Sequence, residues 1–197
     1  MSLASFIGAV AHAYHETGHP LAQSLKPHLL QAAEGAAYTE ANRASALDDL
    51  GKTLSASDAH PIAREIAEIE ALLNWRVAEP MQQHSNTLDR HAFTVLVGSS
   101  GLASSSIITC GLYFQSAGTI YPSHYHAAEE LYFVVSGTAQ WQKGDQAFVP
   151  RAPGDLIHHL SMEPHAMTTL DAPLLAVWAW LGDLDPASYR LEGIPWD

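Results

Sequence analysis

The most informative segment of the chain runs from residue 118 to 137 and reads GTIYPSHYHAAEELYFVVSG. Four of its chemically active side chains, His124, His126, Glu130 and Tyr132, stand at even-numbered positions. Successive side chains of a β-strand point to opposite faces, so positions an even number apart share a face. Burying such polar groups without a partner costs a large desolvation free energy. The segment therefore predicts a strand face whose polar groups share one partner, and a divalent metal ion suits them.

Two imidazoles and one carboxylate form a donor set that is typical of transition metals. Zn, Fe, Mn, Co and Ni accept nitrogen and oxygen donors together, whereas Mg and Ca sites consist almost entirely of oxygen. We therefore expect one divalent metal of the first group as the cofactor. Glu129 points away from Glu130 and is the poorer ligand. The competing interpretation is a solvated strand face that carries these residues by chance, and a further histidine near the end of the chain argues against it.

The chain changes character near residue 80. Before it, alanine, leucine, glutamate and glutamine occur with helical spacing; after it, short β-branched and aromatic runs alternate with turn residues. We expect helices over 3–16, 20–35 and 40–53 and a further one after Asp58, with strands over 92–97, 107–115, 117–121, 130–136, 138–143, 146–149, 154–160, 166–171 and 174–181. The fold class that follows is mainly β with α, without βαβ units.

This change of pattern predicts two parts. Residues 1–80 form a helical segment packed on a metal-binding β-barrel of residues 81–197, and 80–89 is the expected connection. The helical segment is interpreted as a cover over one barrel end, and the alternative is a dimerisation arm. In the helix after Asp58, the apolar spacing of Ile62, Ile66, Ile69 and Leu73 predicts one buried face.

Composition and charge exclude several classes of function. The formal net charge of −12 repels nucleic-acid phosphates and anionic membrane surfaces, so neither is an expected partner. No apolar run approaches the roughly 20 residues that span a bilayer. The single cysteine, Cys110, lies in an apolar run and is interpreted as a buried structural thiol. With no basic segment at the start of the chain, a cytoplasmic location is expected.

The spacing of the first segment matches a known motif. Gly-x5-His-x-His-x3-Glu-x6-Gly is the first conserved motif of the cupin superfamily, which this chain resembles, and the resemblance implies a double-stranded β-helix, or jelly-roll barrel. The second cupin motif corresponds to the segment from Gly154 to His165, although its usual internal Pro-x-Gly is absent. Its register favours His165 as the third imidazole ligand, and His159 and His158 remain alternatives. The other histidines (12, 15, 19, 28, 60, 84 and 91) are interpreted as solvated or hydrogen-bonded.

Over nearly its full length the chain also resembles the cupin dimethylsulfoniopropionate lyases of the DddQ type. That resemblance implies β-elimination, in which a base removes the proton α to the carboxylate, dimethyl sulfide leaves and acrylate remains. It implies His124, His126, Glu130 and His165 as metal ligands. We expect Tyr132 to be the base, and Tyr121 to contact the substrate or to share that role. The alternative for either tyrosine is simple packing.

The substrate implied by this resemblance is a small zwitterion with a sulfonium cation. Aromatic faces attract such a cation, and Trp178 shares a strand face with Trp180. Trp178 is the candidate for substrate binding, whereas Trp180 is interpreted as a packing residue. A monomer or homodimer is expected. The competing functions are an iron-dependent cupin dioxygenase on a small substrate and a non-enzymatic cupin that binds a small molecule.

Overall fold

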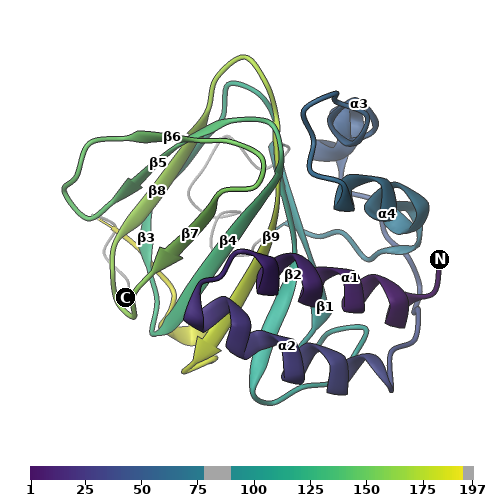
Figure 1. Cartoon of the computed structure of the whole chain (residues 1–197). Coiled ribbons are helices and arrows are strands. Elements are labelled where there is room, and N and C mark those ends of the chain that lie inside the picture. The colour runs from purple at the N-terminus through teal and green to yellow at the C-terminus, as the bar shows by residue number, and fades with distance from the viewer. Residues whose placement is uncertain (78–89, 193–197) are drawn as a thin grey trace.

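The computed structural model describes residues 1–77 and 90–192. Its helical elements are α1 (Leu3–Glu16), α2 (Pro20–Ala33), η1 (Ser45–Asp49), α3 (Leu50–Leu54), α4 (Ile62–Ile69), η2 (Glu70–Leu72) and η4 (Pro186–Ser188). Its strands are β1 (His91–Val97), β2 (Ile108–Gln115), β3 (Ile120–Tyr125), β4 (Ala128–Ser136), β5 (Ala139–Lys143), β6 (Val149–Arg151), β7 (Leu156–His159), β8 (His165–Thr169), β9 (Leu174–Gly182) and β10 (Arg190–Leu191). The predicted class, mainly β with α, is confirmed (Figure 1). Within these ranges no helix is long and apolar enough to cross a membrane.

The described strands form two antiparallel sheets of five. The first sheet has the order β1-β2-β9-β4-β7 and the second has the order β10-β3-β8-β5-β6. From β2 to β5 the chain passes back and forth between the sheets, so that β3, β4 and β5 alternate between them. Successive strands of this stretch therefore lie in different sheets, whereas β5 and β6 pair within one sheet. This arrangement lets side chains from both sheets meet at one inner point.

Two hydrophobic clusters divide the molecule into layers. One cluster joins the helices, through residues such as Phe6, to the outer face of the first sheet, and the other fills the space between the sheets. Strand β9 belongs to both, because Leu175 and Val177 face the helices whereas Ala176 and Trp178 face the interior. The helices thus cover one sheet face (Figure 1), rather than the barrel end that the sequence analysis expects. They do so because this face presents the apolar side chains.

The helical part of the chain agrees with the sequence prediction except in the segment over residues 40–53. Helix α4 buries Ile62, Ile66 and Ile69, as their spacing predicts. The helix expected over 40–53 is wrong in its first half. The backbone of Asn42 there hydrogen-bonds to that of Leu73, and its carbonyl accepts from Trp75, so it is extended; η1 and the short α3 follow it.

Two predicted strands are displaced along the chain. The strand expected over 117–121 begins only at Ile120, because Gly118 adopts a left-handed turn conformation with φ of 63°. The strand expected over 146–149 is found at Val149–Arg151. The expected connection, residues 80–89, lies outside the described residues. Cys110 on β2 is buried as expected, and burial raises the pKa of its thiol to about 12.

Phe6 tests whether the helices are an integral part of the folded unit. Its side chain is completely buried in the cluster shared with the first sheet, so Phe6→Ala is expected to lower the free energy of unfolding by about 3–5 kcal/mol. Leu30 on α2 is 44% exposed, and Leu30→Ala is expected to change the free energy of unfolding by less than about 1 kcal/mol. Urea titration followed by circular dichroism measures both. Equal effects of the two variants would contradict this assignment of the core.

Candidate metal centre and pocket

Four buried side chains converge between the sheets. His124 lies on β3, His126 directly after it, Glu130 on β4 and His165 on β8. One donor atom from each lies within 4.8 Å of those of the others, and each residue is at most 3% exposed. The pairing of β3 with β8 places His124 directly opposite His165. The residues that the sequence analysis expects to act together are therefore neighbours in the fold.

The route by which they meet differs from the expected single strand. His124 and Glu130 lie on different strands in different sheets, because the chain leaves β3 near His126 and enters β4 at Ala128. The inner faces of both sheets look into the same interior, so the side chains converge across this crossing. The even spacing predicts a shared destination, but the assumption of one continuous strand is wrong.

Backbone carbonyls orient all three imidazoles in the same way. His124 Nδ1 lies 2.9 Å from the carbonyl oxygen of Pro122, His126 Nδ1 lies 3.1 Å from that of Ala128, and His165 Nδ1 lies 2.8 Å from that of Glu163. A carbonyl oxygen only accepts, so each Nδ1 carries the proton. In the neutral imidazole, Nε2 then presents a lone pair. This is how protein histidines are prepared to bind a metal ion.

Glu130 is held as a carboxylate at the centre of the cluster. Trp180 donates its indole N–H to Glu130 Oε1 at 2.7 Å, which leaves Oε2 facing the imidazoles. Burial alone would raise the pKa of Glu130, but positive charge on His126 and then on His165 attracts the carboxylate, outweighs burial and lowers that pKa well below its ordinary value. Trp180 is therefore a supporting contact of the cluster, rather than the packing residue that the sequence analysis expects.

The donor atoms fit a shared cation. Glu130 Oε2 lies 3.2 Å from His126 Nε2 and 3.0 Å from His165 Nε2. The second contact has an ion-pair distance but not the geometry of a hydrogen bond, so this buried nitrogen has no hydrogen-bond partner in the part of the chain that the structure describes. Acceptor atoms that face each other at such distances, away from water, are satisfied by a positive charge between them. Three nitrogens and one oxygen are a donor set for a divalent transition metal.

The alternative third imidazoles lie elsewhere. His159 is buried and stacks on the ring of His165, but its Nε2 accepts the indole N–H of Trp141 at 3.1 Å. His158 lies on the other face of β7, where its Nε2 contacts Glu129 at 2.8 Å. Of the three candidates only His165 contributes to the four-residue cluster.

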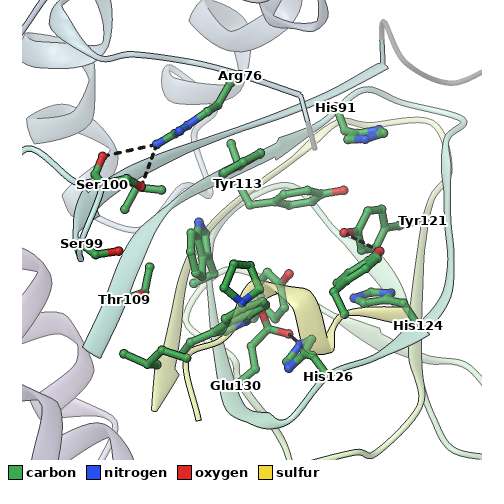
Figure 2. Close-up of a pocket in the computed structure, with 18 residues that line it drawn as sticks. Arg76, His91, Ser99, Ser100, Thr109, Tyr113, Tyr121, His124, His126 and Glu130 are labelled. Atoms are coloured by element: carbon green, nitrogen blue, oxygen red, sulfur yellow. Dashed lines mark hydrogen bonds and ion pairs between the residues drawn. The ribbon is translucent and has the colours of Figure 1, made fainter. Parts of the chain in front are cut away.

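A cavity of about 310 Å³ opens beside the cluster. Figure 2 shows that His124, His126 and Glu130 lie on one side of it, Tyr113, Tyr121 and His91 on a second, and Ser99, Ser100 and Thr109 on a third. The expected site residues Tyr132, Tyr121 and Trp178 all line it. Trp180, Phe93 and Tyr189 also contribute to the wall, so that seven of its 18 lining residues are phenylalanine, tyrosine or tryptophan.

The tyrosines of this pocket differ in their hydrogen bonds. Tyr189 donates to the hydroxyl oxygen of Tyr121 at 3.2 Å, and Tyr113 donates to Gln115 Oε1 at 2.8 Å. The Tyr132 hydroxyl makes no hydrogen bond within the described residues. Burial, followed by the charge of Glu130, raises the pKa of Tyr132 well above its ordinary value. Burial also raises the pKa of Tyr121, but the bond from Tyr189 opposes that rise.

Three residues of the pocket do not stand out in the sequence. Tyr113 lies in an apolar run. Like Thr109 it stands at an odd-numbered position of β2, and this shared strand face is the one signal that it points into the pocket. Tyr189 arrives from η4, where no periodicity predicts its direction. His91 is 1% exposed and neither ring nitrogen bonds to any described residue, which overturns its interpretation as a solvated or hydrogen-bonded histidine.

Two antiparallel sheets enclosing a cluster of imidazoles and a carboxylate define a cupin. The chain belongs to the dimethylsulfoniopropionate lyase family, whose sequence model matches residues 22–176.

Individual relatives agree with this family assignment. The dimethylsulfoniopropionate lyase DddQ of Ruegeria pomeroyi is 35% identical over 120 residues, which is 59% of each chain. The putative lyase DddL of Cereibacter sphaeroides is 30% identical over 61% of this chain and 51% of that protein. The matched region thus spans about half to three-fifths of these curated relatives.

Solved structures extend the likeness to most of the fold. The crystal structure of DddQ from Ruegeria pomeroyi has a TM-score of 0.66 and 25% identity, and covers 91% of this chain and 96% of that chain. A structure from work on the lyases RdDddP and RnDddQII has a TM-score of 0.76 at 23% identity over 96% of this chain and 97% of that chain. The helical part is therefore included in the shared fold.

The bond from Trp180 to Glu130 makes a testable contribution to metal binding. Trp180→Phe removes the indole N–H and frees Oε1, so the carboxylate loses its orientation. We expect the affinity for Zn²⁺ or Co²⁺ to fall about 10- to 100-fold, measured by competition with a chelator of known affinity. Trp178→Phe is the matched control, because Trp178 donates to the backbone of Leu112 and not to the cluster. Unchanged affinity in Trp180→Phe would show that this bond does not position Glu130.

Proposed function

We propose that this protein cleaves dimethylsulfoniopropionate to dimethyl sulfide and acrylate in a metal-dependent β-elimination. Membership of the lyase family and the likeness to DddQ support the substrate and the reaction. The observation that carries the mechanism is the cluster of three imidazoles and a carboxylate at the edge of an aromatic cavity. The cluster offers an anchor for one carboxylate beside a wall rich in aromatic side chains, which suits a small substrate with one carboxylate.

His124, His126, His165 and Glu130 would hold the metal ion through the three Nε2 atoms and Oε2. A divalent cation in that position supplies a Lewis acid, which binds a carboxylate and offsets negative charge that develops beside it. The protein's own contribution is to fix the imidazoles through their Nδ1–H bonds and to keep Glu130 ionised.

The phenolate form of a pocket tyrosine, which a divalent cation nearby would favour, takes the α-proton of the substrate onto its oxygen and becomes the phenol. The electron pair of that C–H bond forms the new double bond, while the C–S electron pair leaves with sulfur as neutral dimethyl sulfide. Tyr132 is the base that the sequence favours. The hydrogen bonds favour Tyr121, because Tyr189 donates to its oxygen and would stabilise a phenolate there, whereas Tyr132 has no such donor and lies beside Glu130. We therefore assign proton abstraction to Tyr121 and keep Tyr132 as the alternative.

The aromatic wall suits the other end of the substrate. A dimethylsulfonium group is a compact cation without N–H donors, so aromatic faces attract it through their negative π-surfaces. Trp178 lies 5.9 Å from the Trp180 ring and 6.4 Å from the Phe93 ring, measured between ring centroids. We assign sulfonium binding to this group of rings, with Trp178 at its centre.

The direct test is to incubate the purified protein with dimethylsulfoniopropionate and measure headspace dimethyl sulfide. We expect release by the metal-loaded protein, loss after treatment with a chelator and recovery when a divalent transition metal is added back. The same assay under strict anaerobiosis separates elimination from an iron-dependent oxygenation. Activity that disappears without oxygen at unchanged metal content would overturn the lyase assignment.

The ligand assignment has its own test in the amount of bound metal. His126→Ala and Glu130→Ala are each expected to lose most of the metal and the activity together, because each removes a donor atom and leaves buried acceptors uncompensated. Metal content by mass spectrometry and dimethyl sulfide release are measured on the same samples. Glu129→Ala is the control, since Glu129 contacts His158 outside the cluster. If a variant keeps its full metal content, the substituted residue is not a metal ligand.

The two candidate bases are separated by conservative variants. Tyr121→Phe is expected to lower kcat about 10²- to 10⁴-fold with near-normal metal content, because only the hydroxyl is lost. Tyr132→Phe is expected to have the smaller effect. If instead Tyr132→Phe abolishes turnover and Tyr121→Phe retains it, Tyr132 is the base.

A further inference from the structure

His91 is a buried histidine that the proposed reaction does not use. It is the first residue of β1, it is 1% exposed, and within residues 1–77 and 90–192 neither Nδ1 nor Nε2 has a hydrogen-bond partner. Leaving a buried polar atom unpaired costs about 1–3 kcal/mol, and an apolar residue at this position would avoid that cost. Burial lowers the pKa of His91 to about 4, so the ring is neutral at physiological pH and offers one donor and one acceptor.

The ring of His91 faces the pocket next to two of its tyrosines. Its centroid lies 5.7 Å from that of Tyr121 in an edge-on arrangement and 6.4 Å from that of Tyr113 in a stacked arrangement. Tyr121 in turn lies 4.3 Å from His124, measured between ring centroids. Tyr121 therefore contacts a proposed metal ligand and His91 (Figure 2).

The hydroxyl protons of these tyrosines can be assigned from their neighbours. Gln115 Nε2 donates to the carbonyl of Thr119 at 2.7 Å, so its Oε1 is an acceptor and Tyr113 is the donor to it. Tyr189 donates to Tyr121, so the proton of Tyr121 itself points elsewhere. Within the described residues that proton has no acceptor. The unpaired ring nitrogen of neighbouring His91 is an acceptor without a donor.

We propose that His91 is a positioning residue for Tyr121, whose hydroxyl donates to a ring nitrogen of His91 through one bridging water molecule. The ring of Tyr113 lies next to the rings of both His91 and Tyr121, so its oxygen would be the third polar contact of that water, which matches the two to four partners that a buried water needs. This inference rests on the proposed function with Tyr121 as the base. It gives the hydroxyl of Tyr121 one direction before the substrate binds. It also explains a buried imidazole in a wall rich in aromatic side chains.

His91→Phe tests the proposal, because it keeps a planar ring and removes both nitrogens. We expect kcat to fall about 10- to 100-fold through misplacement of the base, while KM stays within about twofold and metal content is unchanged. The melting temperature is expected to change little, since the substitution removes one unpaired ring nitrogen together with the one that bonds to the water. His91→Gln, which retains a donor and an acceptor, is expected to recover part of kcat.

The matched control lies on the same strand. Thr94 is buried, and its hydroxyl has no partner within the described residues. Its neighbours Phe93 and Val95 belong to the pocket wall, whereas Thr94 points to the other side of the strand and does not. Thr94→Val is therefore expected to leave kcat unchanged. A kcat within twofold of wild type in His91→Phe would overturn the proposal.

A double-mutant cycle separates action through Tyr121 from an independent effect. In the Tyr121→Phe background, His91→Phe is expected to have almost no further effect on residual turnover. Additive losses would show that His91 does not act through Tyr121. If the wild-type protein releases no dimethyl sulfide at all, the proposed function fails, and the spectroscopic test below decides the hydrogen bond by itself.

Nitrogen NMR of ¹⁵N-histidine-labelled protein detects the bond without turnover. His91→Phe identifies the His91 ring resonances by their loss. Tyr121→Phe keeps the ring and removes only the hydroxyl, so it is expected to shift the acceptor nitrogen of His91, whereas Thr94→Val is not. Unchanged His91 resonances in Tyr121→Phe would refute the hydrogen bond.

Discussion

The structure depends on one constraint, the burial of a carboxylate together with three imidazoles between two sheets. Glu130 cannot remain ionised there without positive charge beside it, and neutral imidazoles that present Nε2 lone pairs do not supply that charge. The sheets bring these atoms within 4.8 Å, and Trp180 fixes one carboxylate oxygen from the side. A positive ion at the centre resolves this conflict. The aromatic cavity then lies directly beside the charge that its occupant would contact.

The fold class and the main features of the sheets follow from the sequence because alternation is a local property. The turn residues and the spacing of Ile62, Ile66 and Ile69 also depend on near neighbours, so they predict elements well. The crossing between β3 and β4 does not depend on near neighbours, so the sequence does not predict it. An even spacing is the same whether the chain continues or changes sheet, and only the tertiary fold shows that it changes sheet after His124.

The residues that the sequence does not reveal share a physical cause. Tyr189 and His91 are placed in the pocket by a short helical turn and by the start of an edge strand, where no periodicity gives the direction of a side chain. His91 also resembles any other surface histidine until its burial is known. The same holds for Trp180, whose bond to Glu130 joins positions 50 residues apart. Long-range contacts of this kind determine which phenol can act as the base.

The backbone carbonyls that orient the imidazoles affect how such a metal centre can change during evolution. Each lies two residues from the histidine that it orients: Pro122 from His124, Ala128 from His126, and Glu163 from His165. The backbone supplies these contacts whatever side chains stand there, although those residues must keep the local chain path. Substitutions in the remaining sequence can accumulate while ligand orientation is preserved, so long as strand register holds. Divergent members of a family can in this way keep one metal chemistry while the pocket around it takes on new substrates.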